Sequence, residues 1–194
     1  MPRSEGSFRR LSLKQANTLK SVGELKLIAL RPDYEVCNFD CGDSDLNGFL
    51  LNDAKNAQAL RIANTFILED DGRIAAYFSL LNDRISRNEI TGSRWKKIKA
   101  NFPVSKQFRS YPCIKIGRFA VSLDYRGQSV GTWLMDRIKG LLNAELSRSA
   151  FRFITVDAYL SAIPFYEKNG FKPLTKKEED DHTRLMFFDM MDVE

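Results

Sequence analysis

The stretch from residue 114 to 171 constrains the fold more than any other part of the chain. Residues 114–121 form an apolar run that predicts a mostly buried strand, and a short turn follows at 122–127. From residue 128 the apolar residues recur with helical spacing, and 151–156 is a second apolar run typical of a strand. This order of strand, turn, helix and strand predicts a βαβ unit. The apolar face of the predicted helix consists of Val130, Leu134, Ile138, Leu141 and Leu142.

The turn that leads into the predicted helix contains Gly127, and Gly131 follows in the first helical turn. Glycine lets the chain bend tightly and lets a ligand approach the backbone. The first backbone N–H groups of a helix have no partner within it and lie at its positive end, so this helix start suits a phosphate. Taken alone, the two glycines also fit a tight turn that binds nothing.

Two motifs in this stretch resemble signatures of the Gcn5-related N-acetyltransferase (GNAT) superfamily. Residues 128–133, Gln-Ser-Val-Gly-Thr-Trp, are similar to its pyrophosphate loop, Gln/Arg-x-x-Gly-x-Gly/Ala. The sequence departs from that pattern at Trp133, where the family usually has a small residue. Residues 162–171, Ala-Ile-Pro-Phe-Tyr-Glu-Lys-Asn-Gly-Phe, look like the family's A-x-x-FY-x-x-x-GF helix. Ser161 is the expected N-cap of this helix, and Asn169-Gly170 its end.

The resemblance implies an α/β (α+β) protein with the GNAT fold, a mixed central sheet of about six to seven strands with helices on both faces. Strands 4 and 5 of that fold, here 114–121 and 151–157, are expected to splay apart and hold acetyl-CoA as cosubstrate, with no metal. Backbone groups of the first strand would pair with the pantetheine arm and orient the thioester carbonyl. The cofactor-binding residues implied in this way are Phe119, Ala120, Val121, Arg126, Gly127, Gln128, Ser129, Val130, Gly131, Thr132 and Phe165.

Tyr166 occupies the position where many members of the family place a tyrosine that donates a proton to the departing CoA sulfur. A phenol with a pKa near 10 is protonated at neutral pH and can make that donation. The alternative is that Tyr166 only packs beside Phe165 in the short helix. No pattern selects a general base; the acids that would act through water are Glu69, Asp83, Glu89 and Asp157.

Residues 84–112 are unusually basic, with eight Lys or Arg residues against one acid, Glu89. Trp95, Ile98 and Phe102 are spaced for one helical face, which predicts a basic amphipathic helix in this insert. Such a helix fits an anionic partner, either the phosphates of CoA or a nucleic-acid backbone. A solvated helix whose apolar side joins the core would show the same pattern.

The remaining segments predict a single domain over residues 25–194, preceded by a basic arm or an added helix at residues 1–24. The chain has 194 residues and is 43% hydrophobic, which is enough for one core. Outside the βαβ unit we expect strands at 25–30, 65–68, 74–81 and 184–190, and a helix that Asp43 or Ser44 caps.

The composition limits both location and chemistry. No apolar run is long enough to span a bilayer and residues 1–10 lack the apolar core of a signal peptide, so we expect a cytoplasmic protein without membrane contact. Cys37, Cys41 and Cys113 lack the spacing of a zinc site or a disulfide frame. The single histidine, His182, follows a run of acids, which argues against a histidine-dependent catalytic triad.

Residues 115–171 also look like the acetyltransferase toxins of bacterial toxin–antitoxin pairs, through GRFAV at 117–121, VDA at 156–158 and FYEKNGF at 165–171. The earlier run at 39–46 has its counterpart there as well. Those toxins acetylate the α-amino group of aminoacyl-tRNA, an amine whose near-neutral pKa needs little help from a base. The resemblance therefore implies aminoacyl-tRNA as acceptor, contacted through the basic 84–112 segment, and an antitoxin as protein partner. It leaves a homodimer open.

Two other functions fit the same sequence. One is acetylation of a small-molecule amine or a protein amine, although a polycationic amine would not be drawn to the basic segment. The other is a non-catalytic module that binds CoA or nucleic acid, which Trp133 would favour if the indole distorted the helix start. Intact Gln128, Gly131 and Tyr166 argue for catalysis instead.

Overall fold

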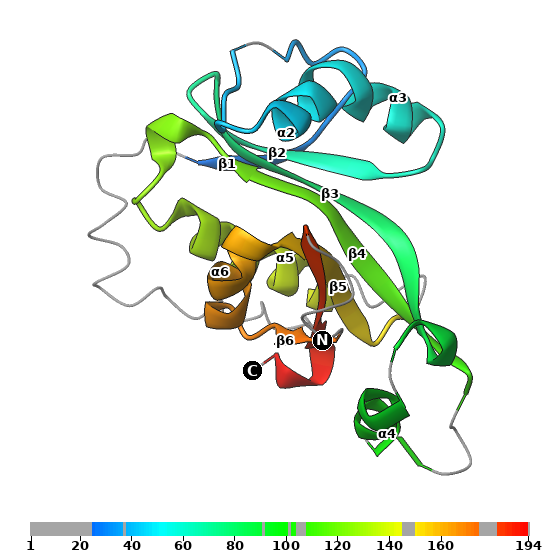
Figure 1. The fold of residues 1–194 in the computed structure, drawn as a ribbon. Coiled ribbons are helices and arrows are strands. Elements are labelled where there is room, and N and C mark those ends of the chain that lie inside the picture. Colours follow the sequence, from blue (N-terminus) through cyan, green and yellow to red (C-terminus); the bar gives the residue numbers. More distant parts are fainter. Residues whose placement is uncertain are drawn as a thin grey trace, which may run out of the picture.

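The central feature of the fold is one mixed β-sheet, with strands in the order β1-β2-β3-β4-β5-β7-β6 (Figure 1). The sheet and its helices confirm the predicted fold class. The arm expected at residues 1–24 lies outside the described part of the chain. The computed structural model describes residues 25–36, 38–90, 92–100, 102–103, 108–144, 150–174 and 182–193.

The sheet is longest in its middle, where β3 and β4 pair. All neighbouring strands run antiparallel except β4 and β5, which run parallel and are joined through helix α5, as the predicted βαβ unit requires. The strands are β1 (Lys26–Ala29), β2 (Asn64–Asp70), β3 (Arg73–Ser86), β4 (Ser110–Val121), β5 (Phe153–Tyr159), β6 (Lys172–Pro173) and β7 (Thr183–Asp189).

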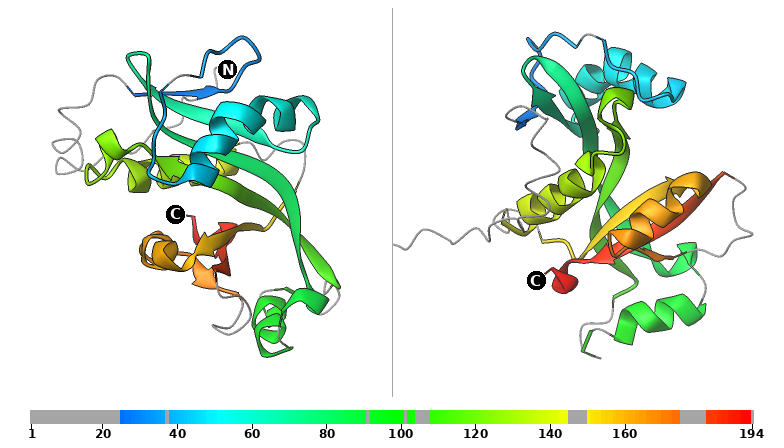
Figure 2. Two further views of the ribbon diagram at one scale, coloured as in Figure 1. Left: turned by 45° about the horizontal axis from the view of Figure 1, so that its top comes forward. Right: turned by 90° about the vertical axis from the view of Figure 1, so that its left-hand side faces the viewer.

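Helices cover both faces of the sheet (Figures 1 and 2). Successive strand residues point to opposite faces, so Tyr77 and Phe78 of β3 mark the two sides. Phe78 shares a core cluster with α5 and α6, whereas Tyr77 shares one with the turn that joins α2 to α3. The helices are α2 (Ser44–Gly48), a π-helical turn (Phe49–Asp53), α3 (Ala54–Ala59), α4 (Gly92–Ala100), α5 (Val130–Ala144) and α6 (Ile163–Lys168).

The cap predicted for the first of these helices is confirmed. The Asp43 carboxylate accepts a hydrogen bond from the Leu46 backbone N–H at 3.0 Å, which satisfies a donor that the helix itself leaves unpaired. Helix α2 is then held to the sheet because the Tyr77 hydroxyl donates to the Leu46 carbonyl at 2.7 Å.

The basic segment at 84–112 contains the end of one strand, a helix and the start of the next strand. Its start belongs to β3 and its end to β4, and α4 lies between them as the predicted amphipathic helix. We expected β3 to end at Leu81, where polar residues begin, but the buried Ile85 continues the strand's inward alternation. Trp95 and Ile98 are buried, so the apolar side of α4 joins the core on the same sheet face as Tyr77, at the opposite end.

Candidate active site

A wedge-shaped opening separates β4 from β5 in the middle of the sheet. The two strands pair only from Cys113 with Phe153 to Lys115 with Thr155, while β4 stays paired with β3 as far as Val121. Among the described residues, no strand therefore pairs with β4 beyond Lys115 on its β5 side. This is the splay that the sequence predicts, and it leaves peptide N–H and C=O groups available to a ligand.

A β-bulge at Gly117 accompanies the opening. The register with β3 shifts there, because Ser79 pairs with Arg118 and Leu80 with Ile116. A Cβ atom at Gly117 would lie 2.5 Å from Cδ2 of Leu81, so only glycine fits without movement of its neighbours. Sequence analysis did not single out this residue, although a glycine inside an apolar strand is a signal for a bulge.

The opening forms a cavity of about 450 Å³ that Tyr166 lines together with Phe119. Tyr166 is 6% exposed, and its ring packs edge-on between Phe165 and Phe171. Among the described residues, none hydrogen-bonds to the Tyr166 hydroxyl. Burial raises the pKa of Tyr166 well above its ordinary value, so the hydroxyl keeps its proton at neutral pH.

Helix α6, which carries Tyr166, is short and is fixed from outside. Pro164 stands in its first turn, where a missing N–H costs nothing. At its other end, the Lys139 ammonium of α5 donates to the Asn169 carbonyl at 2.6 Å and lies 4.3 Å from the ring centre of Phe188. A helix of six residues is marginal by itself, so contacts such as these, together with the packing of Tyr166 on Phe165 and Phe171, hold it in place.

The start of α5 has the backbone geometry expected of an anion site. Gly127 and Ser129 both have positive φ angles, 76° and 60°, and the first helical bond runs from the Trp133 N–H to the Ser129 carbonyl at 3.0 Å. The N–H groups before Trp133 have no partner further back in the helix. A Cβ at Gly131 would lie 3.2 Å from the Phe165 ring, whose centre is 5.5 Å from that of Phe119. The structure thus brings the glycine turn, β4 and α6 together.

Sequence comparison identifies the family that shares this architecture. A family model described as an acetyltransferase (GNAT) domain matches residues 61–173, more than half of the chain. The chain belongs to the GNAT family. It is therefore an N-acetyltransferase by family, and the match includes the β4–β5 opening, the start of α5 and Tyr166.

Solved structures share this fold over most of the length of the chain. A structure of AtaT complexed with acetyl-methionyl-tRNAfMet has a TM-score of 0.72 at 22% identity and covers 87% of this chain and 96% of that one. A tyrosine-to-phenylalanine mutant of KacT also has a TM-score of 0.72 at 22% identity, covering 86% and 95%. AtaTR bound with AcCoA has a TM-score of 0.68 at 22% identity, covering 86% and 94%.

Trp133, which departs from the GNAT pattern, leaves the helix start intact. Helix α5 runs without a break from Val130, and the indole packs partly buried against the main core. The Arg137 guanidinium lies 5.0 Å from the centre of the indole ring, so the outer side of Trp133 makes a cation–π contact. The indole therefore does not distort the turn at 127–131, which the sequence analysis expected to bind phosphate.

Some of the residues expected to bind the cofactor have other contacts in this GNAT domain. Ala120 is buried in the core cluster beneath the π-helical turn and pairs with Tyr77 of β3, so it is not among the residues that line the opening. The Arg126 guanidinium donates to the Cys41 carbonyl and thereby joins the turn before α5 to the loop before α2. In the same loop, hydrogen bonds from Gly42 and Asn47, and then the charge of Arg126, lower the pKa of Asp40.

Among the candidate general bases, Asp157 alone lines the opening. Its carboxylate lies 2.5 Å from the Lys115 ammonium, at the point where the strands part. Glu69 accepts a hydrogen bond from Tyr34 at 2.8 Å, and Asp83 accepts one from Thr155 at 3.0 Å, away from the cavity. The side chain of Glu89 is outside the described part of the structure.

Besides the pair of Lys115 and Asp157, a second ion pair lies at the opening, and sequence analysis did not predict it. Arg118 of β4 lies 3.5 Å from Asp45 of α2, and its guanidinium is 5.2 Å from the ring centre of Phe49. Both charged residues line the cavity. They come from elements distant in sequence, so only the strand pairing and the packing of α2 reveal their proximity.

In the described part of the chain, no helix is long and apolar enough to span a membrane. The same residues contain no group of three or more His, Cys, Asp or Glu side chains arranged to hold a metal.

Proposed function

We propose that this GNAT enzyme transfers an acetyl group from acetyl-CoA to the α-amino group of aminoacyl-tRNA. The observation that carries the proposal is the position of the Tyr166 side chain, which lines the opening where β4 and β5 part. The same arrangement suits any thioester donor and amine acceptor. We therefore infer the binding of acetyl-CoA from the opening, and the identity of the acceptor from the surface around it.

The backbone and the turn bind the donor in this proposal. The pyrophosphate lies at the N–H groups of residues 127–132, at the positive end of α5. The pantetheine arm then runs along the free edge of β4 past Phe119 and Val121, where peptide groups pair with its amides. A backbone N–H of this edge faces the thioester carbonyl and stabilises the oxyanion that forms on attack.

Tyr166 acts as the general acid. The neutral amine attacks the thioester carbon, the C–S bond breaks, and the phenol proton passes to the CoA sulfur. The amine loses one proton to solvent, and a proton from solvent restores Tyr166. A phenol at its ordinary pKa near 10 is already protonated in the neutral range. Burial raises the pKa of Tyr166 further, so the donor form is the populated one.

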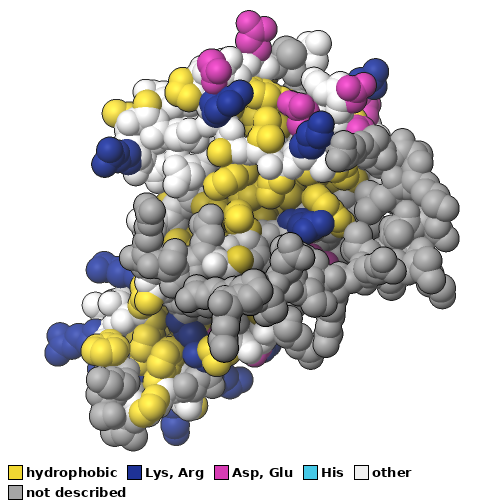
Figure 3. Space-filling model, turned by 180° about the vertical axis from the view of Figure 1, so that it is seen from behind, with side chains coloured by type: hydrophobic (Ala, Val, Ile, Leu, Met, Phe, Trp, Pro, Cys, Tyr) yellow, Lys and Arg dark blue, Asp and Glu magenta, His cyan; other side chains and the backbone are white. Residues whose placement is uncertain are grey.

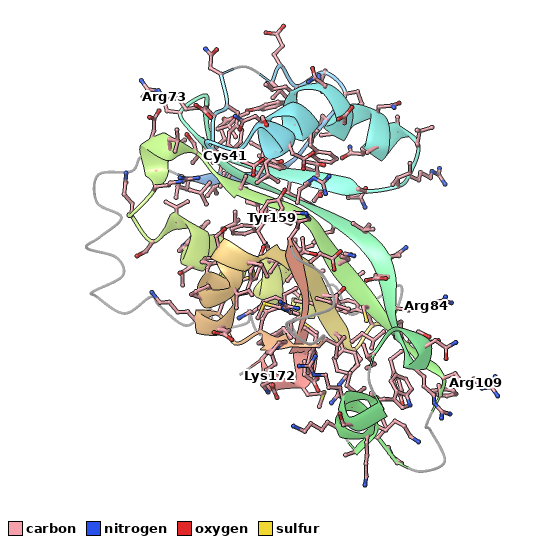
Figure 4. The ribbon with its side chains drawn as sticks, in the orientation of Figure 1. Cys41, Arg73, Arg84, Arg109, Tyr159 and Lys172 are labelled. Carbon is pink, nitrogen blue, oxygen red and sulfur yellow. The ribbon has the colours of Figure 1, made fainter. Side chains whose placement is uncertain are left out.

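The charged surface supports an anionic acceptor. Arg84, Arg87, Lys96, Lys97 and Arg109 are all exposed on or near α4. In the view of Figure 3, Lys and Arg side chains surround this end of the molecule, whereas most acidic side chains lie at the other end, among further Lys and Arg. Figure 4 shows Arg84 and Arg109 at the α4 end. Such a patch attracts a phosphate backbone with little sequence preference.

The comparisons support the same class of partners. The solved complexes of similar fold contain acetyl-methionyl-tRNAfMet in one case, AcCoA in another, and the C-terminus of an antitoxin in a third. Each of these partners belongs to the named complex. For the present chain, an antitoxin and a homodimer stay predictions from the sequence.

The test uses the purified protein, labelled acetyl-CoA and total charged tRNA. We expect label in the tRNA, and for Tyr166→Phe a kcat lower by about ten-fold or more with unchanged affinity for acetyl-CoA. Uncharged tRNA is the control for the acceptor group. An unchanged kcat would remove the acid role from Tyr166. Label on a polyamine or peptide panel but not on tRNA would replace the acceptor with a small-molecule or protein amine.

A further inference from the structure

Tyr159 is a large exposed aromatic side chain inside the active-site opening. It is the last residue of β5, is 41% exposed, and lines the same cavity as Tyr166. In the view of Figure 4 it lies in the middle of the molecule, between α2 and α6. Most aromatic residues of the described chain are in the core clusters, so an exposed one at this position calls for a reason.

The fold itself makes little use of the Tyr159 ring. Among the described residues, the ring packs on no other aromatic ring and the hydroxyl makes no hydrogen bond. The backbone of Tyr159 pairs with Thr183, so its strand position is independent of its side chain. Partial burial, followed by the charges of Asp43 and Asp45, raises the pKa of Tyr159, so the phenol is uncharged at neutral pH.

The charge of the opening shows which kind of contact an acceptor finds there. Lys115 and Arg118 line it, but Asp157 and Asp45 neutralise them at 2.5 and 3.5 Å. Two cations set against two carboxylates give little net attraction for a phosphate. Within the opening, a nucleotide therefore gains more from stacking on an aromatic face than from charge.

The proposed acceptor places a base near this ring. In aminoacyl-tRNA the amino acid is esterified to the terminal ribose, so the amine and the terminal base belong to one nucleotide unit. When the amine is beside Tyr166 and the thioester, the base is within the reach of that unit. Tyr159 lines the same cavity, and unpaired terminal bases are recognised by stacking on aromatic side chains.

We propose that Tyr159 is the stacking platform for the unpaired 3′-terminal base of aminoacyl-tRNA. This inference rests on the proposed function and adds an acceptor-binding residue to it. Stacking tolerates any base, so Tyr159 contributes affinity and placement of the ester, whereas the amino acid is selected elsewhere.

The test compares two acceptors that carry the same amino acid, chosen as one that the tRNA assay labels. One is the aminoacyl ester of adenosine, and the other is the aminoacyl methyl ester, which has no base. For the wild type we expect a higher kcat/KM with the adenosine ester. In Tyr159→Ala the ratio of the two values falls by roughly 5- to 100-fold, the range expected for one stacked base.

Tyr159→Phe is the matched control, because it keeps the ring and removes only the hydroxyl. It should retain the wild-type ratio, and both variants should keep the wild-type affinity for acetyl-CoA. A ratio that is equal in the wild type and Tyr159→Ala would overturn the platform while leaving the proposed function in place. A wild type that acetylates neither charged tRNA nor the adenosine ester would overturn both proposals.

Discussion

Tyr125, in the turn before α5, is linked to the distant hairpin between β2 and β3. Its hydroxyl donates to the Asp70 carboxylate at 2.8 Å, and Asp70 ends β2 beside the turn into β3. Burial, and next the hydrogen bond to Asp70, raises the pKa of Tyr125 to about 12. One of the contacts that hold the turn before α5 therefore depends on a phenol that must stay protonated.

Tyr125→Phe should reduce stability in a pH-dependent way. Below pH 10 the variant lacks one hydrogen bond to a charged group, a loss of about 1–3 kcal/mol. The folded pKa exceeds the unfolded value of about 10, so this stabilisation of the wild type is lost as pH rises from 10 through 12. Urea midpoints at pH 8 and pH 11 measure the effect. A gap between wild type and variant that is as wide at pH 11 as at pH 8 would contradict it.

The sequence motifs predicted some site residues and left others hidden, for a physical reason. Tyr166 and the turn at 127–131 belong to short local patterns, so their neighbourhood is encoded by spacing alone. Arg118 and Asp45 come from β4 and α2, and their proximity depends on strand register and on where α2 packs. Asp157 was one of four candidate acids, and the strand pairing places it at the opening. Arg126 belongs to a local motif, but the motif did not predict that its guanidinium donates to the Cys41 carbonyl.

At the scale of elements, two glycines of neighbouring elements should respond in opposite ways to a larger side chain. Gly117→Val should destabilise the protein by about 1–3 kcal/mol and lower activity, because the new side chain meets Leu81 and Ser79 at the bulge. Gly140→Ala in α5 should stabilise it by about 0.5–1 kcal/mol, since no atom lies within 4 Å and alanine favours the helix.

Thermal unfolding and acetyl-transfer rates together check this pair. A shift of about 2–4 °C per kcal/mol is expected for a chain of this size. Gly140→Ala serves as the control for the general effect of adding a methyl group, and it should leave the rate unchanged. A Gly117→Val protein with wild-type stability and rate would show that the bulge is not needed for the opening.

Helices with regular apolar spacing could be predicted from the sequence. Departures from regular strands and helices could not. The predicted face of α5 is confirmed at Val130, Leu134, Ile138 and Leu142, all of which are buried. The extension of β3 and the bulge of β4 depend on pairing between the two strands, which no single strand's pattern contains. The π-helical turn between α2 and α3 likewise had no signal in its apolar spacing.

Under the proposed function, the basic insert at 84–112 and the active-site opening divide the binding of aminoacyl-tRNA between them. Lys96 and Lys97 are exposed on α4, whose opposite side is anchored by Trp95 and Ile98. Charge at this distance from the reacting atoms affects capture of the acceptor and leaves the chemical step unchanged.

The double substitution Lys96→Ala and Lys97→Ala should raise the KM for charged tRNA and leave kcat unchanged. The slope of log affinity against log salt should decrease in magnitude by about one to two units, as expected when two phosphate contacts are lost. Acetylation of an aminoacyl methyl ester should not change. Lys55→Ala, at an exposed position of α3, is the control for removal of a surface lysine elsewhere, with half the charge change of the double variant. An identical salt slope in the double variant would contradict a role for α4 in tRNA capture.

The alternation of side chains across the sheet has a consequence for re-engineering the enzyme. The parts assigned to the donor, Phe119, α5 and α6, share one face, whereas Arg118, Asp157 and α2 belong to the other. Under the proposed function, neighbouring strand positions therefore serve different substrates. A library directed at new acceptors can randomise Lys115 and Arg118, which share a face on either side of the bulge, together with Asp157, Tyr159 and Asp45, and keep Ile116 and Phe119 fixed to preserve use of the thioester.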